Sequence, residues 1–223
     1  YLWNNNSTDS LLNAGGGSYS VFVTDDQTGC YGEDSINIVE DLAPNTIISG
    51  GGSIFLCDAL YRAKKLKYVC NHHEQAVAMS AEAYSRCSNK IGASIVTTGP
   101  GGTNAITGLV GAWQDSIPCV FIAGQTRIEH TSKGKPIRQL GTQDFDILSI
   151  VKPITKYAAM VESPKRIRYH LEKALYMAFE GRPGPVWIDL PLNFQWESID
   201  PKQLPPFDSS EMVEKEVSSY STH

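Results

Sequence analysis

Apolar and polar residues follow two different rhythms along the chain, and the rhythm changes near residue 41. Before that point, GSYSVFVTDD (17–26) alternates apolar and polar side chains with the period of a strand, and DSINIVE (34–40) looks like a second strand. The remaining positions are rich in Asn, Ser, Thr, Gly and Asp. We therefore expect a short β-rich segment over residues 1–40, although two or three strands rarely fold stably alone.

From residue 44 onward, short strand-like runs alternate with helical periods. Strands are expected at 45–50, 67–71, 93–99, 118–125 and 184–191, and helices at 72–88, 104–114 and 163–181. This alternation predicts an α/β fold in which a mostly parallel sheet carries helices on both faces. We expect this domain to cover residues 44–195, with an irregular stretch over 126–162. The polar, Pro-containing residues 196–223 are expected to be a linker or a disordered tail.

Composition narrows the possible functions. The formal net charge is −5 and no basic block is present, so we expect no nucleic-acid partner. No apolar run approaches the roughly 20 residues that span a bilayer, so we expect no membrane association. The five cysteines are scattered without a C-x-x-C pair, which favours buried thiols, a reducing compartment and a cytoplasmic location.

Three polar or glycine-rich loops each follow a predicted strand: SGGG (49–52), CNHHEQ (70–75) and TTGPGGTN (97–104). Ligands of open parallel sheets bind where the strands end, so we expect the loops to meet at one edge. GPGGTN matches neither a dinucleotide fingerprint nor a P-loop, and a tight strand-to-helix turn remains an alternative interpretation of the glycines. The adjacent His72 and His73 point in different directions, so we predict no metal site.

Glu74 is the candidate acid, because it stands at the start of a predicted helix directly after a strand. It could simply complement the helix dipole. It could also be a desolvated carboxylate that hydrogen-bonds a protonatable ring nitrogen. The residues alone leave both interpretations open.

Four long motifs resemble one family. ISGGG, YVCNHHEQAVAMSAEAYSR, GASIVTTGPGGTNAITGLVGAWQDSIPCVFIAGQ and EGRPGPVWIDLP are similar in order and spacing to the N-terminal, pyrimidine-binding domain of thiamine diphosphate (TPP) enzymes. The acetolactate synthase large-subunit group resembles the chain most. The likeness covers roughly residues 44–195.

The resemblance implies an enzyme and assigns roles to named residues. Glu74 would be catalytic, because the family's acid contacts the aminopyrimidine ring and favours the tautomer that deprotonates the thiazolium carbon. Gln143 would lie near the reacting carbon, and the residue before it is Thr142, where several synthases have Phe. The implied substrate is a 2-keto acid such as pyruvate, which is decarboxylated and then joined to a second carbonyl. Besides Glu74, the cofactor-binding residues would be Gly50, Gly51, Pro100, Gly101 and Asn104.

Two further domains typical of the family have no counterpart in these 223 residues. The family's Mg²⁺ ligands lie on the diphosphate-binding domain, so we expect them on a missing domain or a partner chain. FAD, carried by the middle domain of the synthases, is possible. Because the family's active site forms between subunits, we expect a homo- or hetero-oligomer, and the chain to be a fragment or split subunit.

Two other hypotheses come from different classes. The chain could be a non-catalytic interaction module that retains the fold. It could also belong to a cell-surface β module, because residues 1–40 weakly resemble immunoglobulin-like repeats of secreted bacterial surface proteins. That likeness rests on Tyr1, Trp3, Gly17, Tyr19 and the DSINI run (34–38).

Overall fold

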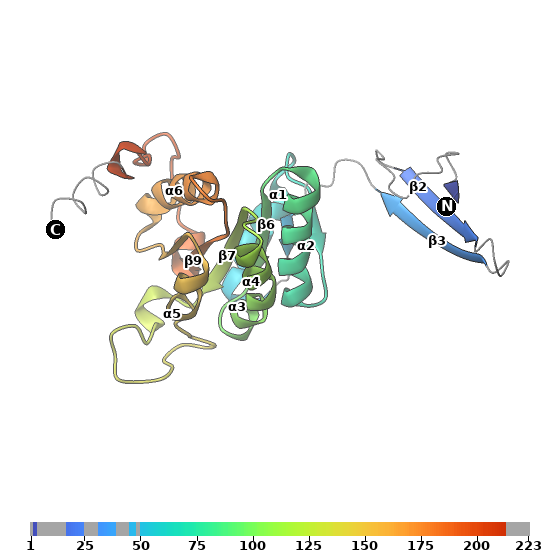
Figure 1. The fold of residues 1–223 in the computed structure, drawn as a ribbon. Coiled ribbons are helices and arrows are strands. Elements are labelled where there is room, and N and C mark those ends of the chain that lie inside the picture. The colour runs from blue at the N-terminus through green and yellow to red at the C-terminus, as the bar shows by residue number, and fades with distance from the viewer. Residues whose placement is uncertain (1, 4–16, 25–30, 39–44, 48–49, 213–223) are drawn as a thin grey trace, which may run out of the picture. The chain divides into compact units, whose positions relative to one another are not determined.

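The computed structural model describes residues 2–3, 17–24, 31–38, 45–47 and 50–212. The chain divides into two compact units, Tyr1–Leu42 and Ala43–His223. The first contains an antiparallel sheet of β1 (Leu2–Trp3), β2 (Gly17–Thr24) and β3 (Tyr31–Ile38), in the order β1-β2-β3. Figure 1 shows the long β2–β3 pair, whose register joins Gly17 to Ile38 and Thr24 to Tyr31.

The second unit is built on a six-stranded sheet in the order β5-β4-β6-β7-β9-β8, in which every described pair is parallel. The strands are β4 (Asn45–Ile47), β5 (Tyr68–Cys70), β6 (Gly92–Val96), β7 (Cys119–Gln125), β8 (Tyr157–Met160) and β9 (Val186–Pro191). The order places β6 and β7 at the centre, and their apolar runs are buried on both faces. The predicted fold class is therefore confirmed.

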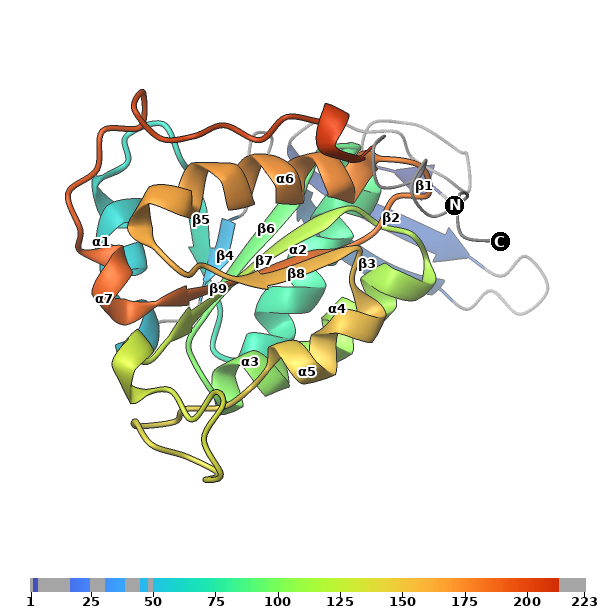
Figure 2. The same ribbon diagram turned by 90° about the vertical axis from the view of Figure 1, so that its left-hand side faces the viewer.

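Helices cover both faces of this sheet, as Figure 2 shows. The α-helices are α1 (Ile54–Arg62), α2 (Glu74–Ser88), α3 (Pro100–Asn104), α4 (Ile106–Gln114), α5 (Leu148–Val151), α6 (Ile167–Phe179) and α7 (Leu192–Gln195). Short 3-10 turns are η1 (Gly51–Ser53), η2 (Ile128–His130), η3 (Lys152–Ile154) and η4 (Pro164–Arg166). Helices α2, α4 and α5 share one hydrophobic cluster, whereas α1 and α6 pack on the other face.

The two faces follow from the pleat of the central strands. On β7, Cys119 and Phe121 point into the cluster beneath α2 and α4, whereas Val120 points into the cluster beneath α6. On β9, Trp187 and Ile188 divide in the same way. The rings of Phe121 and Trp187 stack with their centroids 5.7 Å apart. Continuous apolar runs are required here because neither face meets solvent.

Two sequence expectations need correction. The stretch 126–162 is not irregular throughout, since it contains α5 and the edge strand β8. The cysteines are not uniformly buried: Cys119 is, but Cys70 and Cys87 are exposed. Cys30 lies outside the described residues. Burial raises the pKa of the Cys119 thiol to about 11, which keeps it protonated and unreactive.

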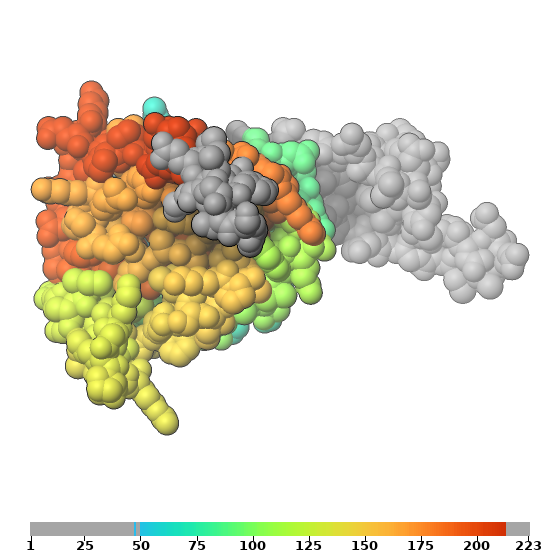
Figure 3. Space-filling view, turned by 60° about the vertical axis from the view of Figure 1, so that its left-hand side comes forward, coloured from blue at the N-terminus to red at the C-terminus, as the bar shows by residue number. Residues whose placement is uncertain are grey.

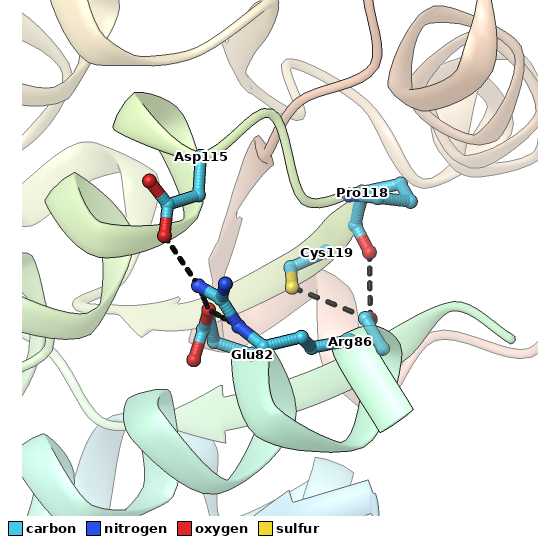
Figure 4. A network of polar contacts seen from close by, with 6 residues as sticks. Glu82, Arg86, Asp115, Pro118 and Cys119 are labelled. Carbon is cyan, nitrogen blue, oxygen red and sulfur yellow. Dashed lines mark hydrogen bonds and ion pairs between the residues drawn. The ribbon is translucent and has the colours of Figure 1, made fainter. Parts of the chain in front are cut away.

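A polar clamp ties the end of α2 to the loops that precede β6 and β7 (Figure 4). Arg86 bridges Glu82 on its own helix and Asp115 after α4, with 2.6 Å between its Nη2 and the Asp115 carboxylate. Beside it, the Ser85 hydroxyl donates to the Pro118 carbonyl at 2.7 Å and accepts from the Gly92 amide at 2.6 Å. The clamp holds the amino ends of β6 and β7, at the opposite end of these strands from the loops considered below.

The segment expected to be a linker or tail contacts α6 over its described part. Glu211 accepts a hydrogen bond from the Tyr169 hydroxyl at 2.8 Å, and the amide of Phe207 donates to Glu172. Figure 3 shows this segment in red beside the orange surface of α6. Residues 213–223 lie outside the described residues.

Candidate functional site

Two of the three loops singled out in the sequence, those after β4 and β6, meet around Thr97 at the carboxyl end of β6. The Gly52 amide donates to the Thr97 hydroxyl at 3.1 Å. A Cβ added at Gly50 or at Gly101 would lie 2.6 Å from atoms of the Thr97 side chain. No Cβ approaches another side chain this closely, so both positions require glycine unless the backbone shifts. The glycine backbone of the loop after β4 therefore packs directly against the Thr97 side chain at the end of β6.

Glu74 opens α2 and faces the turn after β6. The imidazole of His73 caps the helix by accepting a hydrogen bond from the Gln75 amide at 3.1 Å. The half-buried Glu74 carboxylate accepts a hydrogen bond from the Asn104 side-chain amide, with 3.0 Å between Nδ2 and Oε2. Its other oxygen, Oε1, lies 3.3 Å from where a Cβ on residue 101 would stand. The structure thus brings Glu74, Gly101 and Asn104 together.

Gln143 lies on the other side of the same turn. Its backbone is left-handed, with φ of 57°, and its carbonyl lies 3.2 Å from the Thr98 hydroxyl oxygen, as the weaker of two acceptors that share the hydroxyl proton. A Cβ at Gly99, where φ is 59°, would lie 2.5 Å from that carbonyl oxygen. Gly99 therefore serves both the turn and the close approach of the loop that carries Gln143.

A pocket of about 310 Å³ separates Gln143 from the first glycine loop. Gly51 and Gln143 both line it, together with Thr98 and Thr142. Gly50 packs against Thr97, and Pro100 is exposed at the start of α3. The expected residues therefore fall into two neighbouring groups, with Glu74 on one side of the Thr97–Thr98 pair and Gln143 on the other.

The sequence analysis did not predict a buried network of side-chain hydrogen bonds behind the site. Gln125 ends β7, and its Oε1 accepts hydrogen bonds from the Thr98 hydroxyl and the Thr126 amide, both at 2.8 Å. Its Nε2 donates to the Phe145 carbonyl at 3.1 Å and to Asp189 Oδ2 at 3.0 Å. All four hydrogen-bonding positions of this amide are used. Gln125 thereby links the Gly turn, the Gln143 loop and β9.

Asp189 completes this hydrogen-bond network and is only 2% exposed. Burial raises the pKa of its carboxyl to about 7, and the nearby carboxylates of Asp146 and Asp144 add to the rise. Its Oδ1 has no hydrogen-bond partner within the described part of the chain. The signal was visible in the sequence, because VWIDLP places one acid inside an otherwise apolar strand.

Among the residues that the structure describes, no group of three His, Cys, Asp or Glu side chains is arranged to hold a metal ion. Within the same residues, no helix is both long and apolar enough to cross a membrane.

Comparison with known proteins supplies the family. Residues 45–150 match the model described as "Thiamine pyrophosphate enzyme, N-terminal TPP binding domain". This stretch of the chain is an N-terminal TPP-binding domain of the thiamine pyrophosphate enzyme family. The match includes the glycine loops, Glu74 and Gln143.

Several acetolactate synthases are similar to this TPP-binding domain. The large subunit from Haemophilus influenzae is 36% identical over 165 residues, which cover 74% of this chain and 27% of that protein. The large subunit from Buchnera aphidicola subsp. Schizaphis graminum is 40% identical over 142 residues, or 64% and 24% of the two chains. The Escherichia coli isozyme 3 large subunit is 39% identical over 142 residues, which again cover 64% of this chain and 24% of that protein. The chain thus spans about a quarter of the length of these relatives.

Proposed function

We propose that the chain supplies the pyrimidine-binding half of a TPP-dependent enzyme that acts on 2-keto acids, with acetolactate synthase-like chemistry. The observation that carries the proposal is the placement of Glu74. One carboxylate oxygen is held by Asn104, and the other lies against Gly101 with no hydrogen-bond partner among the described residues. A carboxyl group so placed is ready for a polar atom of a ligand.

The residues present fit the aminopyrimidine of the cofactor. Gly101 lacks the Cβ that would otherwise stand 3.3 Å from Glu74 Oε1, so a flat ring can approach the carboxylate over the backbone of the turn. Gly50, Gly51 and Pro100 lie on the adjoining loops and would complete the contacts. The same glycines also serve the turn itself, so the fit rests on Glu74 and not on them alone.

The chain's own contribution is to hold and move a proton. When bound, the cofactor supplies the nucleophilic carbon that attacks the keto acid. The protein orients and polarises the bound cofactor and substrate, as in other cofactor enzymes. Glu74 Oε1 would hold a proton against a ring nitrogen, and Asn104 would fix the carboxylate through Oε2. Gln143, at the neighbouring pocket, would donate a hydrogen bond to the substrate oxygen.

Other parts of the proposal concern groups outside this chain. Mg²⁺ ligands and the diphosphate clamp would come from another domain or subunit, as would any FAD site, and the complete site would require an oligomer. A cytoplasmic location remains a prediction from the scattered thiols.

The experiment is an NMR titration of the ¹⁵N-labelled chain with thiamine, which carries the pyrimidine without the diphosphate. We expect saturable shifts at the amides of Glu74, Gly101 and Asn104, and a weaker affinity for thiamine in the Glu74→Gln variant, whose amide cannot exchange a proton. Glu82→Gln, on the same helix, is the matched control and should bind like the wild type. No shifts with a folded wild-type chain would favour the non-catalytic interaction module instead.

A further inference from the structure

The loop after β7 brings an arginine and a histidine to the pocket that Gln143 lines. Arg127 and His130 both line this pocket of about 310 Å³, beside Gly51 and Gln143. The described lining contains no Asp or Glu. A pocket with this donor set and no carboxylate favours an anionic ligand.

Arg127 is held in place before any ligand binds. Its guanidinium carbon lies 4.8 Å from the ring centroid of Trp196. Trp196 is itself fixed by an edge-to-face contact with Phe55, with 5.2 Å between the ring centroids. The backbone is fixed as well, because the Ile128 amide donates to the Asn193 side chain at 3.0 Å. A cation held over an aromatic ring loses less side-chain freedom when it binds.

The hydrogen-bond donors of Arg127 are nevertheless uncommitted among the described residues. Its one ion pair there joins Nη1 to Glu129 at 3.8 Å, which is longer than a hydrogen bond. Both side chains of this pair are about half exposed, so water screens the attraction. The planar fork of an arginine matches two oxygens of a carboxylate or a phosphate at once.

We propose that Arg127, with His130 beside it, forms a subsite for the anionic oxygens of a ligand that reaches Gln143. The source would be the carboxylate of the keto acid or a phosphate group, and the chemistry of recognition is the same for both. Assigning the carboxylate rests on the proposed function, whereas the anion subsite itself does not.

The test is an NMR titration of the full chain with pyruvate, with its neutral methyl ester, and with inorganic phosphate and pyrophosphate. We expect pyruvate to shift the amides of residues 126–130 and 141–143, and the ester to leave them unchanged. Arg127→Gln should weaken pyruvate binding by about tenfold or more, as expected for a charge-assisted contact. Arg127→Lys keeps the charge without the fork and should retain part of the affinity.

Arg138→Gln is the matched control, because it removes the same charge from an exposed position of the same loop outside the pocket lining. It should change binding by less than about twofold. Arg127-dependent binding of phosphates but not pyruvate would support the subsite and assign it to a phosphate group. The subsite would be overturned if pyruvate and its ester both bind with equal affinity, if folded Arg127→Gln keeps the wild-type affinity, or if none of the anions binds. Thiamine is absent from this titration, so its result stands apart from the fate of the proposed function.

Discussion

Asp189→Asn changes one buried oxygen to nitrogen and should change how the stability of the protein depends on pH. The carboxyl is 2% exposed and has a pKa of about 7, against about 4 for an unfolded aspartate. Between these two values, the folded chain binds a proton that the unfolded chain has released. Stability due to this group therefore falls as pH rises from about 4 to about 7, and stays constant above that window.

The magnitude follows from the shift. One pKa unit corresponds to about 1.4 kcal/mol, so a rise of about three units corresponds to roughly 4 kcal/mol lost across the window. The side-chain amide that the substitution introduces stays neutral throughout. It keeps an acceptor for Gln125 and turns its NH₂ toward a small cavity that Asp144, Asp146, Lys133 and Lys152 also line. The variant should therefore match the wild type near pH 4 and be more stable by up to about 4 kcal/mol above pH 7.

Urea unfolding at a series of pH values measures this difference. The far-ultraviolet circular dichroism of the helices reports on the second unit, since the described helices all lie within it. The low-pH measurement is the internal control, because both side chains are neutral there. If the two stability curves run parallel from about pH 4 to pH 8, the carboxyl titrates normally and the argument from its burial is wrong.

Three further changes test other contacts. Gly101→Ala would place a methyl 2.6 Å from Thr97 Cγ2 and 3.3 Å from Glu74 Oε1, so it should cost about 1–3 kcal/mol in urea unfolding, whereas Gly111→Ala, with open space around it, should not destabilise. Gln125→Glu sets a second carboxylate 3.0 Å from Asp189 and should displace the Gln143 amide resonance. Adding Asp189→Asn restores a hydrogen-bond donor and should return the resonance to its wild-type position. An unmoved resonance in Gln125→Glu would refute the link between Gln125 and the Gln143 loop. Ser85→Ala leaves the buried Gly92 amide without its acceptor and should cost about 1–3 kcal/mol; a thermal unfolding midpoint equal to that of the wild type would show that the hydrogen bonds of Ser85 contribute nothing.

The sequence predicted the sheet well where the strands are central. The apolar runs of β6, β7 and β9 are buried on both faces, and continuous runs of this length are typical of the inner strands of a parallel sheet. The edge strand β8 was missed because YAAM is short, half-buried and made largely of small residues. Helix α1 was not predicted as an element, since its nine residues follow directly on a glycine turn.

Some features of the candidate site could likewise be predicted from the sequence, and others could not. The meeting of three loops was predictable, because strands of a parallel sheet end at a common edge. The Gln125–Asp189 contact joins residues 64 positions apart, and the packing of Arg127 on Trp196 depends on where α7 ends. Such contacts follow from the folded backbone and leave no periodic trace in the sequence. The role of Glu74 remained open between a helix-dipole partner and a ligand group for the same reason.

The central claim is that Glu74 serves TPP chemistry, and reconstitution tests it most directly. The chain would be mixed with a chain that carries the diphosphate-binding domain of a TPP enzyme, in the presence of Mg²⁺ and TPP, and pyruvate consumption would be followed. The account predicts turnover only in the mixture, and its loss in Glu74→Gln while TPP still binds by calorimetry. Turnover that survives Glu74→Gln, or a folded mixture that never binds TPP, would contradict it.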